Sequence, residues 1–306
     1  MAWSDVIGLE LAKRIWQAHL ASGQVASAYL PAGIDGIGKR RLAIEMAKTL
    51  TCKNAASEPC DACQSCAQIA RAVQPDVHVI VPSEGSEAIK IQDMRALLGR
   101  IGLHPFSSRF QVAIITEAER LTEEASNSLL KSLEEPSPHT RFILTSGHLG
   151  RCLPTILSRC QVIKCSPLTI EQTAALVVKQ SGCSDDIARA AARQSQGSVS
   201  AALAIAQKWQ ERSAVWSQLE RPAREWASAQ LPERRQEVIE LLDAMVDRLR
   251  ALAVAHAGGP AEVDDYVETA FALIELRDSV EHFVNPKLAA NLAREKWLTL
   301  APQVNG

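Results

Sequence analysis

The feature that most constrains this chain is a short apolar strand that runs into a glycine-rich turn and then into a helix. The strand is expected over residues 26–31, the turn covers 33–39, and the helix follows Lys39. Further strands are expected at 77–81, 112–115, 141–145 and 161–164, and helices at 9–22, 91–101 and 122–135. Short apolar strands that alternate with helices are typical of a parallel sheet covered on both faces. The pattern therefore predicts an α/β domain over residues 1–166.

After Pro167 the sequence contains no strand candidate, and Ala and Leu recur at helical spacing. Short helices are expected at 185–194 and 198–207. Longer ones are expected at 209–220, 233–257 and 262–283, with breaks at Pro222, Gly258-Gly259-Pro260 and Pro286. The pattern predicts a small helical domain over 167–208 and a larger helical domain over 209–306. More than one domain also fits 306 residues, at roughly 150 residues per domain.

The glycine-rich turn matches the phosphate-binding loop G-x-x-x-x-G-K-[ST] at every position except the last. Gly33, Gly36 and Gly38 allow the backbone amides to face a phosphate, and Lys39 would reach the terminal phosphates. A glycine-rich turn without a ligand is the alternative, but the position between a strand and a helix favours the phosphate loop. Arg40 replaces the Ser or Thr whose hydroxyl would hold Mg²⁺. The loop is thus degenerate, and weak binding of a nucleotide or anion stays open.

The partner motif of such a loop is an acidic pair after an apolar strand, and its first carboxylate serves Mg²⁺. Here the strand at 112–115 ends in Thr116 and Glu117, so the first carboxylate is missing. Glu117 stands where a water-activating carboxylate would sit, although it could equally be a solvated surface charge. Hydrolysis of ATP depends on a metal that bridges the β- and γ-oxygens. We therefore expect no ATP hydrolysis at this site.

Four of the eight cysteines lie within residues 52–66, namely Cys52, Cys60, Cys63 and Cys66. Two C-x-x-C steps let four thiolates converge on a structural Zn²⁺, and this reading is favoured over a redox pair or an iron–sulfur cluster. The other cysteines are expected to be small buried apolar residues, and they are Cys152, Cys160, Cys165 and Cys183.

The charge is close to balanced, with 33 Lys and Arg against 35 Asp and Glu. A net charge of −2 argues against nucleic-acid binding by bulk electrostatics alone. No apolar run reaches the ~20 residues that span a bilayer, and the first residues lack the pattern of a secretory signal. A cytoplasmic protein without membrane contact is expected.

Two further segments are informative together, residues 127–136 (NSLLKSLEEP) and Ser158-Arg159-Cys160. With the phosphate loop, the cysteine cluster and residues 27–30 (SAYL), they resemble the bacterial DNA polymerase III clamp-loader subunits of the AAA+ type, the delta-prime subunits most closely. The resemblance is dense over residues 4–165, moderate to about 207 and weak beyond, where 285–288 resembles a turn of the collar domain. It implies a RecA-like sheet domain, a helical lid and a C-terminal collar for oligomerisation.

The resemblance also implies roles. Arg159 would be an arginine finger that reaches the ATP of a neighbouring subunit, so we expect it to contribute nothing to its own subunit's fold. The family's lid helix begins Gly-Ser-x-Arg, and Ser200 replaces that nucleotide-sensing arginine here. The implied partners are gamma/tau and delta subunits in a hetero-pentamer, and through it the sliding clamp and primed DNA. The chain would be a non-hydrolysing part of a DNA-directed DNA polymerase holoenzyme, a nucleotidyltransferase complex.

Two alternatives remain. The chain could be a divergent ATP-hydrolysing motor subunit of the gamma/tau kind, against which Arg40, Thr116 and Ser200 count. It could also be a zinc-dependent nucleic-acid-binding module. The surroundings of the cysteines disfavour that reading, because Glu58 and Asp61 flank them and only Lys53 opposes.

Overall fold

The computed structural model describes residues 3–55, 57–82, 88–101, 104–219, 230–255, 260–282 and 284–304. The chain divides into two compact units, Met1–Ala206 and Gln207–Gly306.

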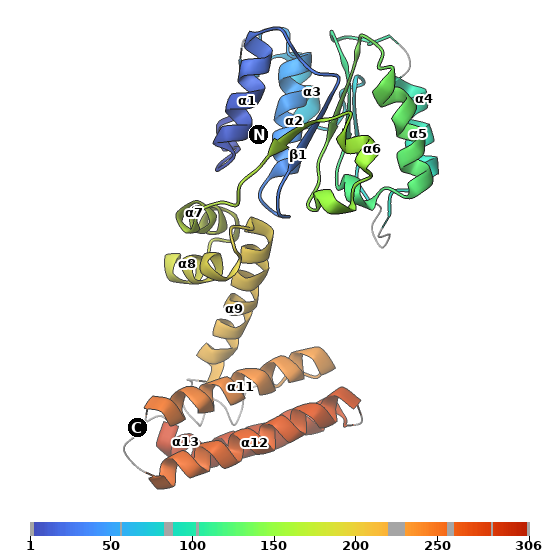
Figure 1. The fold of residues 1–306 in the computed structure, drawn as a ribbon. Helices are drawn as coiled ribbons and strands as arrows, with labels where there is room; N and C mark the ends of the chain where they lie inside the picture. Colours follow the sequence, from blue (N-terminus) through green and yellow to red (C-terminus); the bar gives the residue numbers. More distant parts are fainter. Residues whose placement is uncertain are drawn as a thin grey trace. The chain divides into compact units, whose positions relative to one another are not determined.

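A parallel sheet forms the centre of the first unit (Figure 1). Its strands are β1 (Ala28–Ala32), β2 (Val77–Ile80), β3 (Gln111–Ile115), β4 (Thr140–Leu144) and β5 (Gln161–Lys164), in the order β2-β3-β4-β1-β5. In the register of β1, Tyr29 pairs with Ile143 of β4 and with Gln161 of β5. The predicted α/β fold class is confirmed, because all the strands expected from apolar runs are present and parallel.

Helices cover both faces of this sheet, as Figure 1 shows. On one side lie α1 (Glu10–Ala21) and α2 (Lys39–Thr51), and on the other α4 (Ile91–Ile101) and α5 (Glu123–Glu134). Alternate residues of β3 enter different cores: Val112 and Ile114 pack with α1 and α2, whereas Ala113 and Ile115 pack with α4 and α5. All four are fully buried. Burial on both faces explains why these strands are continuous apolar runs rather than alternating ones.

The N-cap of α5 is the one that the sequence predicts, because the Thr122 side chain accepts a hydrogen bond from the Ala125 amide. Two helices of the first unit were not anticipated: α3 (Gln64–Ala70) and α7 (Ile170–Ser181). A capping box between Thr169 and Gln172 begins α7. This T-x-x-Q spacing was the available signal.

The predicted helix at 185–194 is confirmed as α8 (Asp185–Gln194). By contrast, the separate helices expected at 198–207 and 209–220 form one helix, α9 (Val199–Leu219). No Gly or Pro interrupts this stretch, so nothing in the chain ends a helix there.

The second unit begins within α9 and contains α11 (Arg235–Ala255), α12 (Pro260–His282) and α13 (Pro286–Val304). Their shared core includes the fully buried Leu242 and Tyr266, and also Trp297, which is 2% exposed. The expected breaks at Pro222 and at Gly258-Gly259 lie outside the described residues. Among the helices that are described, none is long and apolar enough to span a membrane.

Candidate phosphate-loop site and cysteine cluster

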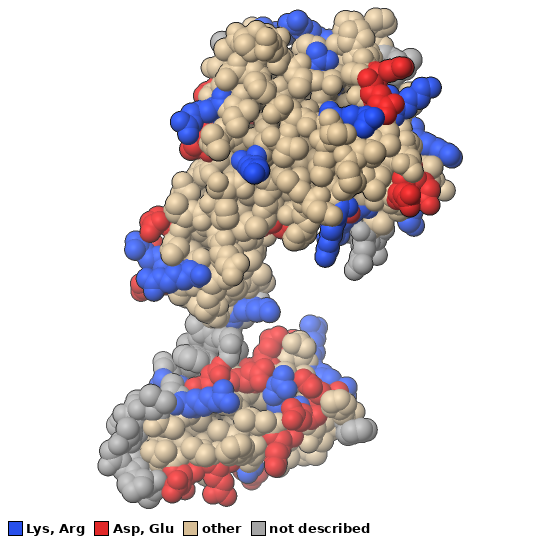
Figure 2. All heavy atoms as spheres, viewed as in Figure 1, with Lys and Arg blue, Asp and Glu red and all other residues tan. Residues whose placement is uncertain are grey.

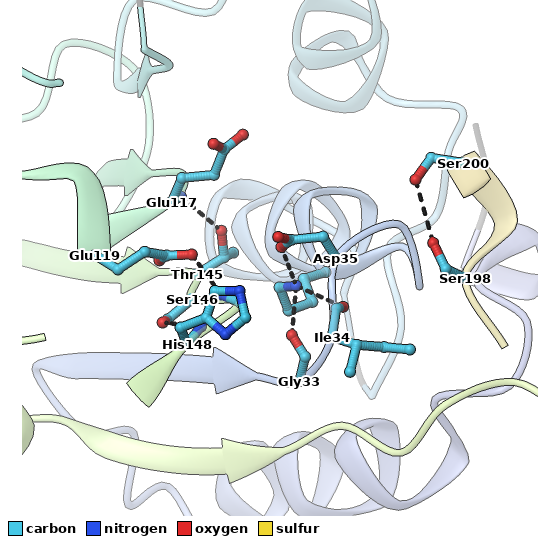
Figure 3. Close-up of polar contacts among 12 residues, drawn as sticks. Gly33, Ile34, Asp35, Glu117, Glu119, Thr145, Ser146, His148, Ser198 and Ser200 are labelled. Atoms are coloured by element: carbon cyan, nitrogen blue, oxygen red, sulfur yellow. Dashed lines mark hydrogen bonds and ion pairs between the residues drawn. The ribbon is translucent and has the colours of Figure 1, made fainter. Parts of the chain in front are cut away.

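The phosphate loop connects the carboxyl end of β1 to α2, and its lysine is bound by the loop itself. Its loop partners Gly33, Ile34 and Asp35 are labelled in Figure 3. Lys39 is only 6% exposed. Its Nζ donates to the carbonyl oxygens of Gly33 at 2.6 Å and Ile34 at 2.8 Å, and pairs with Asp35 Oδ1 at 3.1 Å. The lysine's positive charge is therefore already partly compensated from within the loop.

A second carboxylate lies at the same edge of the sheet. Glu119 Oε1 accepts a hydrogen bond from the amide of Gly147 at 2.7 Å. A Cβ added at Gly147 would lie 2.4 Å from Asp35 Oδ1, so this side chain approaches the same glycine from the loop. Figure 3 shows Asp35 and Glu119 pointing toward this region from different elements. Negative side chains beside the loop weaken its attraction for a phosphate. Sequence reasoning missed both, although Asp35 stands inside the motif.

The beginning of α9 packs directly on the loop. The Val199 amide donates to the carbonyl oxygen of Gly36 at 3.0 Å. Gly36 has a φ of +80°, and a Cβ there would lie 2.1 Å from Ser200 Oγ and 2.3 Å from Ser198 Oγ. The Oγ atoms of the two serines lie 3.3 Å apart. Residue 200, where the resemblance places a sensing arginine, is thus occupied by a small side chain in close contact with the loop.

The positions that would serve Mg²⁺ hold other groups. Arg40 is an exposed residue of the first turn of α2. The buried Thr116 hydroxyl donates to the Ile80 carbonyl oxygen at 3.1 Å, which fixes it to the end of β2. Glu117 has a left-handed backbone with φ of 55°, and its carboxylate pairs with Arg120 at 2.8 Å. Among these residues only Glu117 offers a carboxylate, and an arginine already neutralises it.

The cysteine cluster is confirmed as a group that could hold a metal. The sulfur atoms of Cys52, Cys60, Cys63 and Cys66 lie within 4.8 Å of one another. Cys60 Sγ is 3.4 Å and Cys63 Sγ 3.8 Å from Cys52 Sγ. A tetrahedron with Zn–S bonds of about 2.3 Å has edges of about 3.8 Å, so the thiols fit Zn²⁺ and are too far apart for disulfides. Hydrogen bonds from the amides of Ala62 and Cys63 and from the Cys52 thiol lower the pKa of Cys60 to about 6, which favours its thiolate.

The loop that carries the cysteines is anchored to the first unit by charged residues. Lys48 on α2 is 1% exposed, and its Nζ lies 2.8 Å from both Glu45 Oε1 and Asp61 Oδ1. A further contact joins Gln17 of α1 to Glu58 at 3.1 Å. The acidic residues beside the cysteines thus hold the module in place, a role the sequence pattern did not indicate.

Arg159 follows α6 (Pro154–Leu157) and has a partner within its own subunit. Its Nη2 lies 2.6 Å from Oε1 of Glu134 on α5, and its Nη1 donates to the Thr155 carbonyl oxygen at 2.9 Å. The side chains of Arg159 and Glu134 remain 32% and 48% exposed. The expectation that Arg159 takes no part in its own subunit's structure needs correction, because Glu134 holds the guanidinium. An exposed pair of this kind contributes at most about 1 kcal/mol.

The scattered cysteines agree with the sequence interpretation in three cases. Cys152, Cys165 and Cys183 are buried, whereas Cys160 is half-buried. Burial raises the pKa of Cys165 to about 11 and that of Cys160 to about 12, so both remain thiols at neutral pH.

Comparison with known proteins gives one family. The family model described as "DNA polymerase III, delta subunit" matches residues 8–169, just over half of the chain. The chain is 39% identical over 147 residues to the DNA polymerase III subunit delta-prime of Pseudomonas aeruginosa, covering 48% of this chain and 45% of that protein. It is 35% identical over 169 residues to the subunit gamma of Buchnera aphidicola, covering 55% and 46%. The chain thus spans about half the length of these curated relatives.

Longer matches have lower identity. The Escherichia coli subunit delta-prime is 29% identical over 216 residues, which cover 69% of this chain and 65% of that protein. A gamma subunit-related protein of Thermotoga maritima covers 95% of this chain and 99% of its own at 15% identity and a TM-score of 0.43. Delta-prime and gamma relatives match with similar identity. Because the family model matches more than half of the chain, the chain belongs to the DNA polymerase III, delta subunit family of clamp-loader subunits.

Proposed function

We propose that this chain is a delta-prime-like scaffold subunit of a clamp loader. It does not hydrolyse ATP itself, and it supplies Arg159 as an arginine finger to the ATP site of a gamma/tau-type neighbour. Within a hetero-pentamer with gamma/tau and delta subunits, it helps to load the sliding clamp onto primed DNA. Residues 1–166 serve as its AAA+ domain, 167–208 as the lid and 209–306 as the collar through which the subunits associate.

The observation that carries this proposal is the state of the phosphate loop. Lys39 is engaged by two loop carbonyls and by Asp35. Arg40 and Thr116 stand where Mg²⁺ ligands would be needed, and phosphoryl transfer depends on that metal for most of its electrostatic stabilisation. A chain of this family with such a site can act on ATP only through a neighbour.

ATP turnover by the isolated chain tests the non-hydrolysing part of the proposal. We expect none above background, and Arg40→Thr alone should not restore it, because Thr116 and Ser200 remain. Turnover on the order of 1 s⁻¹, typical of working enzymes, would favour the alternative of a divergent motor subunit. That alternative draws support from the gamma relatives and from the intact Lys39.

The role of Arg159 is tested in a complex reconstituted with gamma/tau-type and delta-type subunits. Arg159→Ala should leave assembly and melting temperature nearly unchanged and should lower DNA-stimulated ATPase and clamp loading. Arginine fingers supply about 10³–10⁵ in rate at a single site, and the loss should be smaller where other interfaces keep their own fingers. Arg151→Ala, an exposed arginine just before α6, is the matched control. Unchanged loading by the Arg159→Ala complex would remove the finger from the proposal.

A further inference from the structure

A cavity of about 560 Å³ lies in the first unit, at the opposite end of the sheet from the phosphate loop. Phe110 stands directly before β3 and Arg141 near the start of β4, so the cavity lies at the amino ends of the parallel strands. The phosphate loop follows the carboxyl end of β1. The two sites therefore share no residue, and the cavity lies in the size range of small-ligand pockets, about 300–1,000 Å³.

Among the described residues that line this cavity are three basic side chains and no carboxylate, together with Cys52 of the cysteine cluster. The basic residues are Arg109, Arg141 and Lys53. None of these three cations forms an ion pair within the part of the chain that the structure describes. On the face of the first unit seen in Figure 2, basic side chains are scattered over a mostly uncharged surface. A concave site with three unpaired cations is thus a local concentration of charge in a chain of net charge −2.

The two arginines are held in place by an aromatic ring. The Cζ atoms of Arg109 and Arg141 lie 5.0 Å and 4.3 Å from the ring centroid of Phe110. Arg141 also donates through Nη1 to the carbonyl oxygens of Thr140 at 2.7 Å and Pro138 at 3.1 Å. Its Nε is buried and has no hydrogen-bond partner in the described part of the chain. The side chain is therefore pre-organised without a counterion.

Burial is the main cause that lowers the pKa of Arg141, and the neighbouring positive charge of Arg109 acts in the same direction. The buried carboxylate of Asp76 contacts two residues of the lining but forms no ion pair with the arginines in the described part of the chain. Asp76 accepts hydrogen bonds from Ser107 and Ser108, which line the cavity, and it does so through both their amides and their hydroxyl groups. An anion that entered the cavity would relieve the repulsion between the two guanidinium groups.

We propose that this cavity is an anion site that binds phosphate groups through Arg109, Arg141 and Lys53. Guanidinium groups match the oxygens of a phosphate in two-point contacts, and a ring-stacked arginine loses little further entropy on binding. The phosphate can come from free inorganic phosphate or from the backbone of a single-stranded nucleic acid. Both sources present the same oxygens, and the experiment separates them.

The test uses the full chain loaded with Zn²⁺ and a fluorescent single-stranded tetranucleotide with a 5′-phosphate, followed by anisotropy. We expect saturable binding that weakens with salt, with a slope of about −0.7 per phosphate contacted. Arg109→Gln and Arg141→Gln should each raise the Kd at least tenfold. Arg109→Gln should also make the salt slope less steep by about 0.7, the value for one phosphate contact. Displacement of the probe by millimolar inorganic phosphate identifies the free ion as a ligand, whereas no displacement identifies the nucleic-acid backbone.

Two control variants locate the site. Arg95→Gln removes an exposed arginine of α4, which belongs to neither site, and should leave the Kd unchanged. Arg120→Gln removes an exposed arginine that pairs with Glu117 at the other edge of the sheet, and it should also have no effect. If Arg141→Gln does not fold, Arg109→Gln and Lys53→Gln carry the test, because both side chains are exposed and their removal spares the core.

Three results would overturn the proposal. They are loss of binding in Arg95→Gln, an unchanged Kd in the variants of all three cations, and no saturable binding of the tetranucleotide at low salt. Displacement of the probe by a poly-glutamate peptide more readily than by phosphate would assign the cavity to carboxylates instead.

Discussion

Replacing the buried Asp76 by Asn should destabilise the first unit more than an Asp→Asn change at an exposed position does. Asp76 is fully buried just before β2. Its Oδ1 accepts from the Phe106 amide at 2.5 Å. Its Oδ2 accepts from the amides of Ser107 and Ser108 at 2.8 and 2.9 Å and from their hydroxyl groups at 2.9 and 2.8 Å. One carboxylate thus orders the turn that leads into β3.

The magnitude follows from the number of donors that lose their acceptor. An Asn side chain keeps one oxygen, which can take the Oδ2 position and its four donors, while its NH₂ group then faces the Phe106 amide. The amide left without an acceptor costs about 1–3 kcal/mol and the other four hydrogen bonds lose a charged acceptor, so the free energy of unfolding should fall by about 3 kcal/mol. For a unit of this size that is a decrease in Tm of roughly 6–12 °C. Circular dichroism during thermal unfolding measures it, with the exposed Asp185→Asn as the control, which should change stability by less than about 0.5 kcal/mol.

The pH dependence gives a second check. Burial would raise the pKa of Asp76, but hydrogen bonds from the amides of Phe106 and Ser107 and the two serine hydroxyl groups outweigh it and lower the pKa below 3.8. The stabilisation is therefore fully present above the unfolded value and is lost as pH falls through the lower folded value. The difference between the native chain and Asp76→Asn should be constant from pH 5 to 7 and shrink below about pH 4. A variant as stable as the native chain at pH 7, or a difference that grows with acid, would refute this reasoning.

Three further predictions concern the cysteine loop and the phosphate loop. Cys63→Ser should lower bound zinc from one per chain to none by elemental analysis while the sheet's circular dichroism persists, and native protein purified without chelator but lacking zinc would contradict the site. Lys48→Met should lower the free energy of unfolding in urea by about 3–5 kcal/mol, because it leaves the buried Glu45 carboxylate without its cation. Adding Glu45→Gln should recover part of this stability, and no recovery would count against this cause. Gly36→Ala should destabilise the first unit by 1–2 kcal/mol more than Gly38→Ala, since both have positive φ but only Gly36 lies against the serines of α9, and equal losses by calorimetry would contradict that contact.

Local patterns predicted most of the first unit. The helix at 91–101 and the strand at 161–164 have the bounds expected, because an apolar run or a helical repeat determines each element by itself. The helix α7 was missed because its first turn carries Glu171, Gln172 and Thr173, and its start is marked only by the capping box. The fusion of two expected helices into α9 reflects continuity of the backbone, which periodicity alone did not reveal.

The candidate site was predictable where its residues are neighbours in the sequence. The cysteine spacing and the phosphate loop are motifs of that kind. The contacts that position them join residues far apart along the chain: Lys48 and Asp61 are 13 positions apart, Glu134 and Arg159 are 25, and Asp76 and Ser107 are 31. No sequence pattern specifies such pairs, because the sheet order and the helix packing decide which charges meet. The proposed roles of Arg159 and the zinc ligands therefore stay predictions, although their surroundings are now defined.

The contact between the phosphate loop and α9, which begins within the proposed lid, bears on why the proposed scaffold subunit would remain stationary. A ligand can shift a conformational equilibrium only by the difference between its binding free energies for the two states. In a nucleotide-driven subunit, that difference would come from Mg²⁺ ligands, a free lysine and a lid arginine that contact the phosphates. Here Lys39 is bound to loop carbonyls, Thr116 to the end of β2, and residue 200 is a serine packed against Gly36. Because the lid already rests on the loop through the Val199 amide and the Gly36 carbonyl, a bound nucleotide would gain few contacts by moving it. The geometry thus supports a subunit whose lid position is fixed by its own residues and not by the nucleotide state.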